Sequence, residues 1–293
     1  MALPKKIIDF HAHIYPEKIA EKAAINVGNF YDTTMNHQHA ISDVLIESGS
    51  KIGVTNYVVH SVATKPKQVV SINDFILNEA RKHKEFIPFA TYHQDFEDFE
   101  KEIDRVTNQG AKGFKMHPDF QKFQVDDRCM DSFYSCLEER MIPILFHAGD
   151  CRFDFSGPRR IANVLNKHPK LKVIAAHFGG YTEWDESYEW LCGRDVWFDT
   201  SSTTWKLPFD KAKEMIKKHG AKWFLFGSDF PMWDHVGEWE RFQNFGFRFM
   251  QIKFKLFIRF YRYNQIFGIN KFNHLIKFIY KFIVIFAFFN DIN

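Results

Sequence analysis

Residues 7–14 read IIDFHAHI, an apolar run that carries one aspartate and two histidines. Side chains alternate across a strand, so His11 and His13 share one face at a spacing that lets both bind a single ion. This H-x-H pattern alone is a weak signal, because two hydrogen-bonded buried histidines give the same sequence. The positions of the other polar residues along the chain therefore decide its interpretation.

Seven further apolar runs follow, and amphipathic stretches separate them. The runs are NYVVHSVA (56–63), FIPFATYH (86–93), GFKMHP (113–118), IPILFHAG (142–149), KVIAAHFG (172–179), VWFDTSS (196–202) and WFLFGSDFP (223–231). From the second run onward they recur every 24 to 30 residues, which is the length that a strand, a helix and two short loops need. The pattern predicts an α/β fold, a (β/α)8 barrel, although a doubly wound open sheet has similar local signals.

The stretches between the runs have helical periodicity. Two of them place apolar residues on one side of a helix and polar residues on the other. These apolar residues are Met130, Phe133, Tyr134 and Leu137 in one stretch and Phe209, Ala212, Met215 and Ile216 in the other. Pro208 and Gly220 mark the expected start and end of the second helix,.

Composition and length indicate one soluble globular domain. The chain has 293 residues, of which 45% are hydrophobic and 26% charged,. The start of the chain lacks the features of an export signal, and the four scattered cysteines fit reduced thiols, so we expect a cytoplasmic protein. The expected partner is a small-molecule substrate, with no nucleic acid and no membrane, and a homo-oligomer stays open.

The last part of the sequence differs from the rest. Residues 246–293 are rich in Phe, Ile, Lys, Asn and Tyr, which A/T-only codons can encode, and residues 242–293 hold 8 Lys or Arg against 1 Asp or Glu. We therefore expect a barrel over residues 1–245, followed by an atypical tail produced by a reading-frame shift near Phe245. A membrane anchor or a basic surface helix ranks lower, because the longest uncharged apolar run is far shorter than the roughly 20 residues that span a bilayer.

Polar residues gather at the C-terminal ends of the runs, where barrel active sites are built. His147 ends the fifth run, His177 ends the sixth, and Asp229 lies in FGSDFP of the eighth. The first and eighth strands of a closed barrel are neighbours, so Asp229 can approach His11 and His13. Imidazoles with a carboxylate suit zinc, manganese or iron, whereas magnesium and calcium prefer more oxygen ligands.

Four of these motifs carry a resemblance to a known family. DFHAHIYP, LFHAG, AAHFGG and FGSDFP, in this order and spacing, resemble the amidohydrolase superfamily. The most similar branch is the amidohydrolase-related group that includes aminocarboxymuconate-semialdehyde decarboxylase and resorcylate-type decarboxylases. The resemblance covers roughly residues 5–245.

The resemblance implies a metal site and roles for its residues. It implies one divalent ion, zinc first with manganese or iron as alternatives, held by His11, His13, His147 and Asp229. His177 would then move protons or stabilise charge beside the ion, and Asp229 would also transfer the proton of an attacking water. Lys115 stands where larger binuclear relatives have a carboxylated lysine. Because this branch works with one metal, we interpret Lys115 as a pocket cation or a packed strand residue.

The expected activity follows from this resemblance. The chain should be a metal-dependent hydrolase that uses a metal-activated water on a small-molecule amide, lactone or similar bond. One alternative is a carboxy-lyase, a nonoxidative decarboxylase of an aromatic or unsaturated acid. A second alternative is an inactive remnant with a damaged C-terminus.

Several other polar and aromatic residues near strand ends have more ordinary interpretations. His60, His93 and His117 are each expected to be hydrogen-bonded buried or loop histidines, with contact to substrate left open. Arg152 could clamp a substrate carboxylate. Tyr181, Trp184 and Trp233 could line the pocket or pack in the core. Arg152 follows the fifth run, Tyr181 and Trp184 follow the sixth, and Trp233 follows the eighth.

Overall fold

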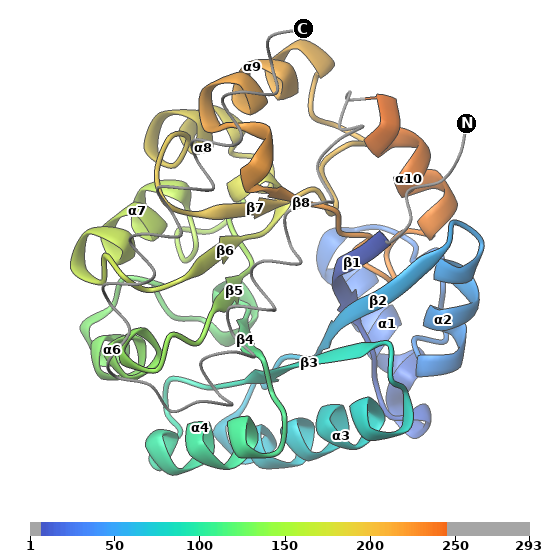
Figure 1. Cartoon of the computed structure of the whole chain (residues 1–293), viewed down its shortest axis with the longest axis vertical. Helices are drawn as coiled ribbons and strands as arrows, with labels where there is room; N and C mark the ends of the chain where they lie inside the picture. Colours follow the sequence, from blue (N-terminus) through green and yellow to red (C-terminus); the bar gives the residue numbers. More distant parts are fainter. Residues whose placement is uncertain (1–6, 245–293) are drawn as a thin grey trace, which may run out of the picture. The chain divides into compact units, whose positions relative to one another are not determined.

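The computed structural model describes residues 7–244, which form a barrel of eight parallel strands (Figure 1). The strands are β1 (Ile7–His13), β2 (Val54–His60), β3 (Phe86–Thr91), β4 (Gly113–Met116), β5 (Ile144–Phe146), β6 (Val173–Ala175), β7 (Trp197–Asp199) and β8 (Phe224–Leu225). Each strand pairs with the next in chain order. The segment after β8 then closes the ring, because Phe10 N donates to Phe226 O and His13 N donates to Phe230 O, both at 2.8 Å. The closed barrel is confirmed over the open sheet.

Helices surround the strands (Figure 1). The α-helices are α1 (Glu17–Tyr31), α2 (Ser42–Ser50), α3 (Val69–Lys82), α4 (Phe99–Asn108), α5 (Pro118–Gln121), α6 (Asp131–Glu139), α7 (Pro158–Lys167), α8 (Trp184–Trp190), α9 (Phe209–His219) and α10 (His235–Asn244). Short 3-10 turns are η1 (Pro66–Gln68), η2 (Arg128–Met130), η3 (His177–Gly179) and η4 (Ala221–Trp223). Among residues 7–244, none of the helices has the length and apolar character needed to cross a membrane.

The two expected helical faces occur at α6 and α9. In α6 the side chains of Phe133, Tyr134 and Leu137 are buried, as the periodicity predicts. The expectation for Phe209 is wrong, because its side chain is 43% exposed. Phe209 is the first residue of α9, and Lys213 Nζ lies over its ring, 4.0 Å from the ring centroid.

Packing between the helices and the strands makes the core. Tyr92 after β3 stacks on Phe133 of α6 with ring centroids 4.0 Å apart. In α10, the rings of Trp239 and Phe242 lie 5.3 and 5.2 Å from the ring of Phe226, next to β8. The last helix of the described residues thus covers the strand that precedes Asp229. The interpretation of residues 246–293 as an aberrant tail lies outside the described residues and stays a prediction.

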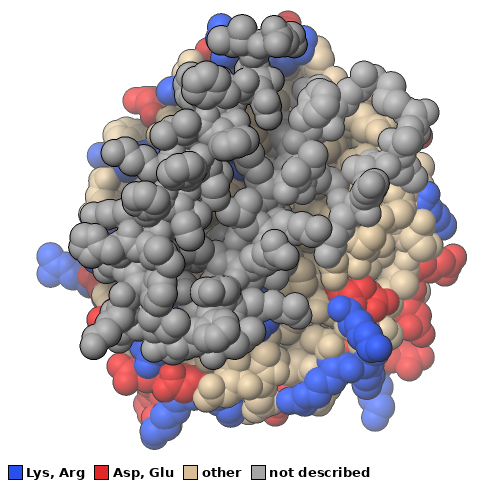
Figure 2. All heavy atoms as spheres, viewed as in Figure 1, with Lys and Arg blue, Asp and Glu red and all other residues tan. Residues whose placement is uncertain are grey.

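Charged side chains of both signs are interspersed around the edge of the face shown in Figure 2. Among the described residues, Lys211 Nζ pairs with Asp185 Oδ1 at 2.6 Å and Arg160 Nη2 pairs with Asp154 Oδ2 at 2.6 Å. Exposed pairs of this kind contribute roughly 0–1 kcal/mol each. The stability of the barrel therefore depends on its buried apolar contacts.

A buried histidine away from the strand ends gives a pH-dependent stability. Burial lowers the pKa of His219 from 6.5 to about 4, so the unfolded chain binds more protons than the folded chain between these values. His219 thus stabilises the fold above pH 6.5, and this contribution, roughly 3 kcal/mol, is lost as the pH falls toward 4. In urea unfolding of metal-free protein, the free energy of unfolding of wild type should exceed that of His219→Gln by less and less as the pH falls from 6.5 toward 4. A constant advantage from pH 7 to 4.5 would contradict the prediction.

Candidate metal centre

Three side chains from β1 and the segment after β8 converge on one point. His11 Nε2 lies 3.2 Å from His13 Nε2, and Asp229 Oδ1 lies 3.4 Å from His11 Nε2 and 3.5 Å from His13 Nε2. The Asp229 backbone, with φ 58°, donates its N–H to His11 O at 2.9 Å and so stays beside β1. A tetrahedral ion with bonds of about 2.0–2.1 Å separates its ligand atoms by roughly 3.4 Å. The three atoms therefore lie at the separations that one ion requires.

A carboxylate on β7 orients His11. Asp199 Oδ2 lies 2.8 Å from His11 Nδ1, and Ser201 Oγ donates to Asp199 Oδ1. Burial alone raises the pKa of Asp199, but the neighbouring His11 ring outweighs it and lowers the pKa to about 2. The ionised carboxylate therefore accepts the proton of His11 Nδ1. His11 Nε2 then carries the lone pair that can bind an ion, as in the carboxylate–histidine–metal arrangement.

Removing this carboxylate should weaken metal binding. For Asp199→Ala we expect an affinity for zinc about 10- to 100-fold lower, because His11 loses the group that fixes its ring and tautomer. Competition with a chromophoric chelator measures the change. Asp195→Ala is the control, since Asp195 is an exposed residue near β7 whose carboxylate pairs with Lys172. Equal zinc affinity in wild type and Asp199→Ala would refute this role.

The two histidines after β5 and β6 face each other. His177 Nε2 lies 3.0 Å from His147 Nδ1, and His177 Nδ1 lies 2.9 Å from Ser201 O. Because a carbonyl only accepts, His177 carries its proton on Nδ1, and Nε2 is an acceptor toward His147. The closest polar contact of His147 is thus His177, while the convergent trio is His11, His13 and Asp229.

Lys115 on β4 reaches the same point. Its Nζ lies 3.2 Å from His11 Nε2, and the side chain is fully buried. Burial lowers the pKa of Lys115 to about 8, although Asp199 and Asp229 act in the opposite direction. The sequence left Lys115 as a pocket cation or a packed strand residue. Lys115 is a buried strand residue, and it also lines the cavity described below.

A second group of polar side chains lies beside His147. The rings of His117 and His147 stack at 3.9 Å with an interplanar angle of 7°. Tyr31 Oη, from the end of α1, lies 2.9 Å from His117 Nε2 and 3.5 Å from His147 Nε2. Asp119 Oδ2 is 3.8 Å from His147 Nε2, and burial raises the pKa of Asp119 to about 7. These residues support His147 from the side away from His177.

Most of these groups line one cavity of about 640 Å³, whereas Asp199 and Ser201 do not line it. Its floor is formed by the polar residues at the strand ends, and its wall is largely apolar. The wall includes Ile19, Val27, Phe30, Ile72, Phe75 and Met232. A site of this size with an apolar wall and a few convergent polar groups suits a small organic molecule.

The remaining candidates have other partners. Arg152 pairs with Asp150, Nη2 to Oδ2 at 2.6 Å, and Nη1 donates to Phe30 O, so it is held away from a clamping role. Tyr181 lines the cavity, whereas Trp184 is buried and donates Nε1–H to His177 O at 3.1 Å.

For two more residues, Trp233 and His93, the sequence left open whether they contact substrate. Trp233 Nε1 donates to Ser202 Oγ at 2.9 Å. His93 accepts from Asp95 N through Nδ1 at 3.2 Å, as expected for a hydrogen-bonded histidine.

The donor set fits a divalent ion. Burial lowers the pKa of His13 to about 4 and that of His147 well below 6.5, so both rings are neutral at pH 7 and can donate a lone pair. Burial raises the pKa of Asp229, but His11 and its neighbours outweigh this and hold the pKa well below its usual range. Neutral imidazoles with an ionised carboxylate are the ligand forms that zinc, manganese and iron bind.

Sequence reasoning missed Asp199 and Tyr31. Asp199 is the last residue of β7 and follows the same rule as the other strand-end residues, so it could have been found. Tyr31 ends a helix that precedes the second strand, and no local pattern marks it as part of the site.

The chain resembles known proteins in sequence and in fold. The sequence family described as amidohydrolase matches residues 8–250. No curated protein matches the chain. Among solved structures, an uncharacterised TIM-barrel protein from Bordetella bronchiseptica is 17% identical with a TM-score of 0.64, covering 82% of this chain and 91% of that chain.

Two further structures share the fold. A dihydroxybenzoic acid decarboxylase from a Polaromonas species, with bound manganese and the inhibitor 2-nitroresorcinol, is 15% identical, with a TM-score of 0.63 and coverage of 82% and 91%. A 2-pyrone-4,6-dicarboxylic acid hydrolase assigned in Pseudomonas putida is 16% identical, with a TM-score of 0.58 and coverage of 83% and 92%.

Proposed function

Because this chain belongs to the amidohydrolase family and is an enzyme of that family, we propose that it hydrolyses an amide, lactone or similar bond of a small molecule. We propose one divalent ion, zinc first, with manganese or iron as alternatives. Its ligands would be His11, His13, His147 and Asp229. The observation that carries the proposal is the convergence of His11 Nε2, His13 Nε2 and Asp229 Oδ1 within 3.2 to 3.5 Å.

The residues of the proposed metal site would have different roles in the reaction. When bound, a divalent ion lowers the pKa of a water toward roughly 7 and polarises a substrate carbonyl. Asp199 keeps the proton of His11 on Nδ1, so His11 presents Nε2. Asp229 Oδ2 accepts from Ser202 Oγ, and we assign this carboxylate the proton of the attacking water and its delivery to the leaving group.

His177 would act as the neighbouring base. Burial lowers its pKa to about 4, so the ring is neutral at pH 7, and its proton-accepting atom is Nε2, which faces His147 Nδ1 at 3.0 Å. Its Nδ1–H is held by Ser201 O, which fixes the direction of Nε2. The apolar wall of the cavity excludes competing water from the reacting groups.

Decarboxylation is a second candidate, and Lys115 is the observation that favours it. Its ammonium group lies 3.2 Å from His11 Nε2, where it could pair with the carboxylate of an aromatic or unsaturated acid. Lys115 and Lys122 are the cations among the described residues that line the cavity, and no arginine in that part of the chain lines it. This sparse positive charge favours a substrate with little negative charge, and hence hydrolysis.

The test separates the two reactions. Zinc- and manganese-loaded protein would be assayed against a panel of lactones, amides and carboxylated aromatic acids, with both acid formation and carbon dioxide release followed. We expect hydrolysis of neutral lactones or amides. Carbon dioxide from resorcylate-like acids, with no hydrolysis, would replace this proposal by the decarboxylase. About one ion per chain in soluble protein would favour the enzyme, and protein that binds no metal would favour the inactive remnant.

Other properties stay proposals. We propose a small-molecule substrate, a cytoplasmic location and no nucleic-acid or membrane partner, with a homo-oligomer left open. Their support is the sequence composition and the size of the cavity.

A further inference from the structure

His60, the last residue of β2, is buried and has no hydrogen-bond partner on either ring nitrogen. The sequence predicts an ordinary hydrogen-bonded histidine here, and this expectation is wrong. Its neighbour Ser61 already donates Oγ–H to Ile14 O at 2.5 Å. Buried polar atoms in folded proteins almost always have a partner, and an exception points to a bound water or ion.

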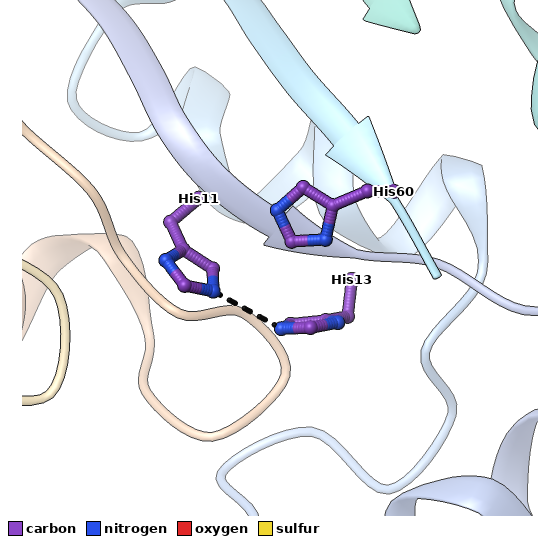
Figure 3. A group of neighbouring side chains, drawn as sticks. All are labelled: His11, His13 and His60. Atoms are coloured by element: carbon purple, nitrogen blue, oxygen red, sulfur yellow. Dashed lines mark hydrogen bonds between the residues drawn. The ribbon is translucent and has the colours of Figure 1, made fainter. Parts of the chain in front are cut away.

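The surroundings of His60 favour a bound ion over a bound water as the missing partner. Its ring centroid lies 4.4 Å from that of His13 and 4.9 Å from that of His11, at interplanar angles of 87° and 72°. Figure 3 shows that both nitrogens lie on the side of the ring turned toward His11 and His13. One ligand atom from each of the three rings can be chosen so that all lie within 4.8 Å of one another.

These distances match imidazoles around a single ion. With metal–nitrogen bonds of about 2.1 Å, two rings at neighbouring coordination positions have centroids roughly 4.5 to 5.2 Å apart. The His11 and His13 centroids are 5.1 Å apart, and the two distances to His60 lie close to the same range. An edge-to-face contact between neutral rings is only a weak substitute for a hydrogen bond.

We propose that His60 supplies a further imidazole to the metal centre, in addition to the proposed ligands His11, His13, His147 and Asp229. This inference rests on the proposed function, because it requires an ion at that point. A neutral imidazole has a lone pair on one nitrogen, and the ion would be its partner. The added nitrogen donor shifts the preference of the centre further toward zinc, iron or manganese and away from magnesium or calcium.

Two variants of the full chain test the inference. In His60→Leu and His60→Gln we expect the affinity for zinc to fall at least 10- to 100-fold, measured at pH 7.5 by competition with a chromophoric chelator. The melting temperature of metal-free His60→Leu should not fall, because no hydrogen bond is lost. The matched control is His219→Leu. His219 is also buried but is hydrogen-bonded to Gly193 N and Val196 O, so this variant should lose stability and keep its zinc affinity.

A spectroscopic count provides a second readout. X-ray absorption of zinc-loaded protein should show one imidazole fewer in His60→Gln than in wild type. Zinc affinity within twofold of wild type in both His60 variants, or an unchanged imidazole count, would overturn the inference. If His11→Ala loses zinc while the His60 variants keep it, only the role of His60 fails. If wild type binds no ion, the proposed function fails as well. Should His60→Leu not fold, His60→Gln decides.

Discussion

His11→Ala and His13→Ala proteins are expected to lose bound metal together with activity. Each histidine supplies one corner of the triangle in which the ligand atoms lie 3.2 to 3.5 Å apart. Loss of a residue that only hydrogen-bonds to a ligand already lowers metal affinity about 10- to 100-fold, so loss of a ligand itself should lower it more than roughly 100-fold. Metal content by mass spectrometry after dialysis against zinc-buffered solution gives the occupancy.

The control for this experiment is another histidine at a strand end. His93 follows β3 and accepts a hydrogen bond from the Asp95 backbone. His93→Gln should therefore keep about one ion per chain. Full metal occupancy in both His11→Ala and His13→Ala would show that these two histidines are not metal ligands, and the proposed metal site at β1 would be wrong.

His177→Ala should keep most of its metal while turnover falls by about 100- to 10,000-fold, the contribution typical of a proton-transferring group. His177 contacts His147 Nδ1 through Nε2 at 3.0 Å and does not belong to the trio of His11, His13 and Asp229. Its loss should therefore remove a base and leave those three donors in place. Measurement of kcat and of zinc content on the same sample separates the two effects.

A conservative variant shows whether the ring or its volume matters. His177→Gln keeps a polar side chain near Ser201 O but lacks the basic ring nitrogen of histidine. We expect its turnover to be as low as that of His177→Ala. If His177→Ala loses zinc to the same extent as His11→Ala, then the contact between His147 and His177 reflects a shared ion, and His177 is a ligand.

Several features followed from the sequence because their causes are local or follow from barrel symmetry. The eight apolar runs became the eight strands, and the resemblance of DFHAHIYP and FGSDFP to the amidohydrolase family is confirmed by the match over residues 8–250. The approach of Asp229 to His11 and His13 was also predictable. Alternation places both histidines on one face, and closure makes the first and eighth strands neighbours.

The orientation and environment of each ring needed the tertiary structure. His11 and Asp199 are 188 residues apart in the chain, and no periodicity shows that one carboxylate fixes the tautomer of that ring. Tyr31 reaches His117 only because α1 ends over the cavity.

The sequence by itself thus determined the barrel, the strand-end positions of its histidines and aspartates, and the family. Local periodicity and strand order suffice for these. Only the tertiary structure decided that His147 lies against His177, that Asp199 holds His11, and that His60 is buried without a hydrogen-bond partner. Partners of this kind depend on which side chains from distant strands meet at the same depth of the barrel. That depth is set by strand register and packing, which a single sequence does not display.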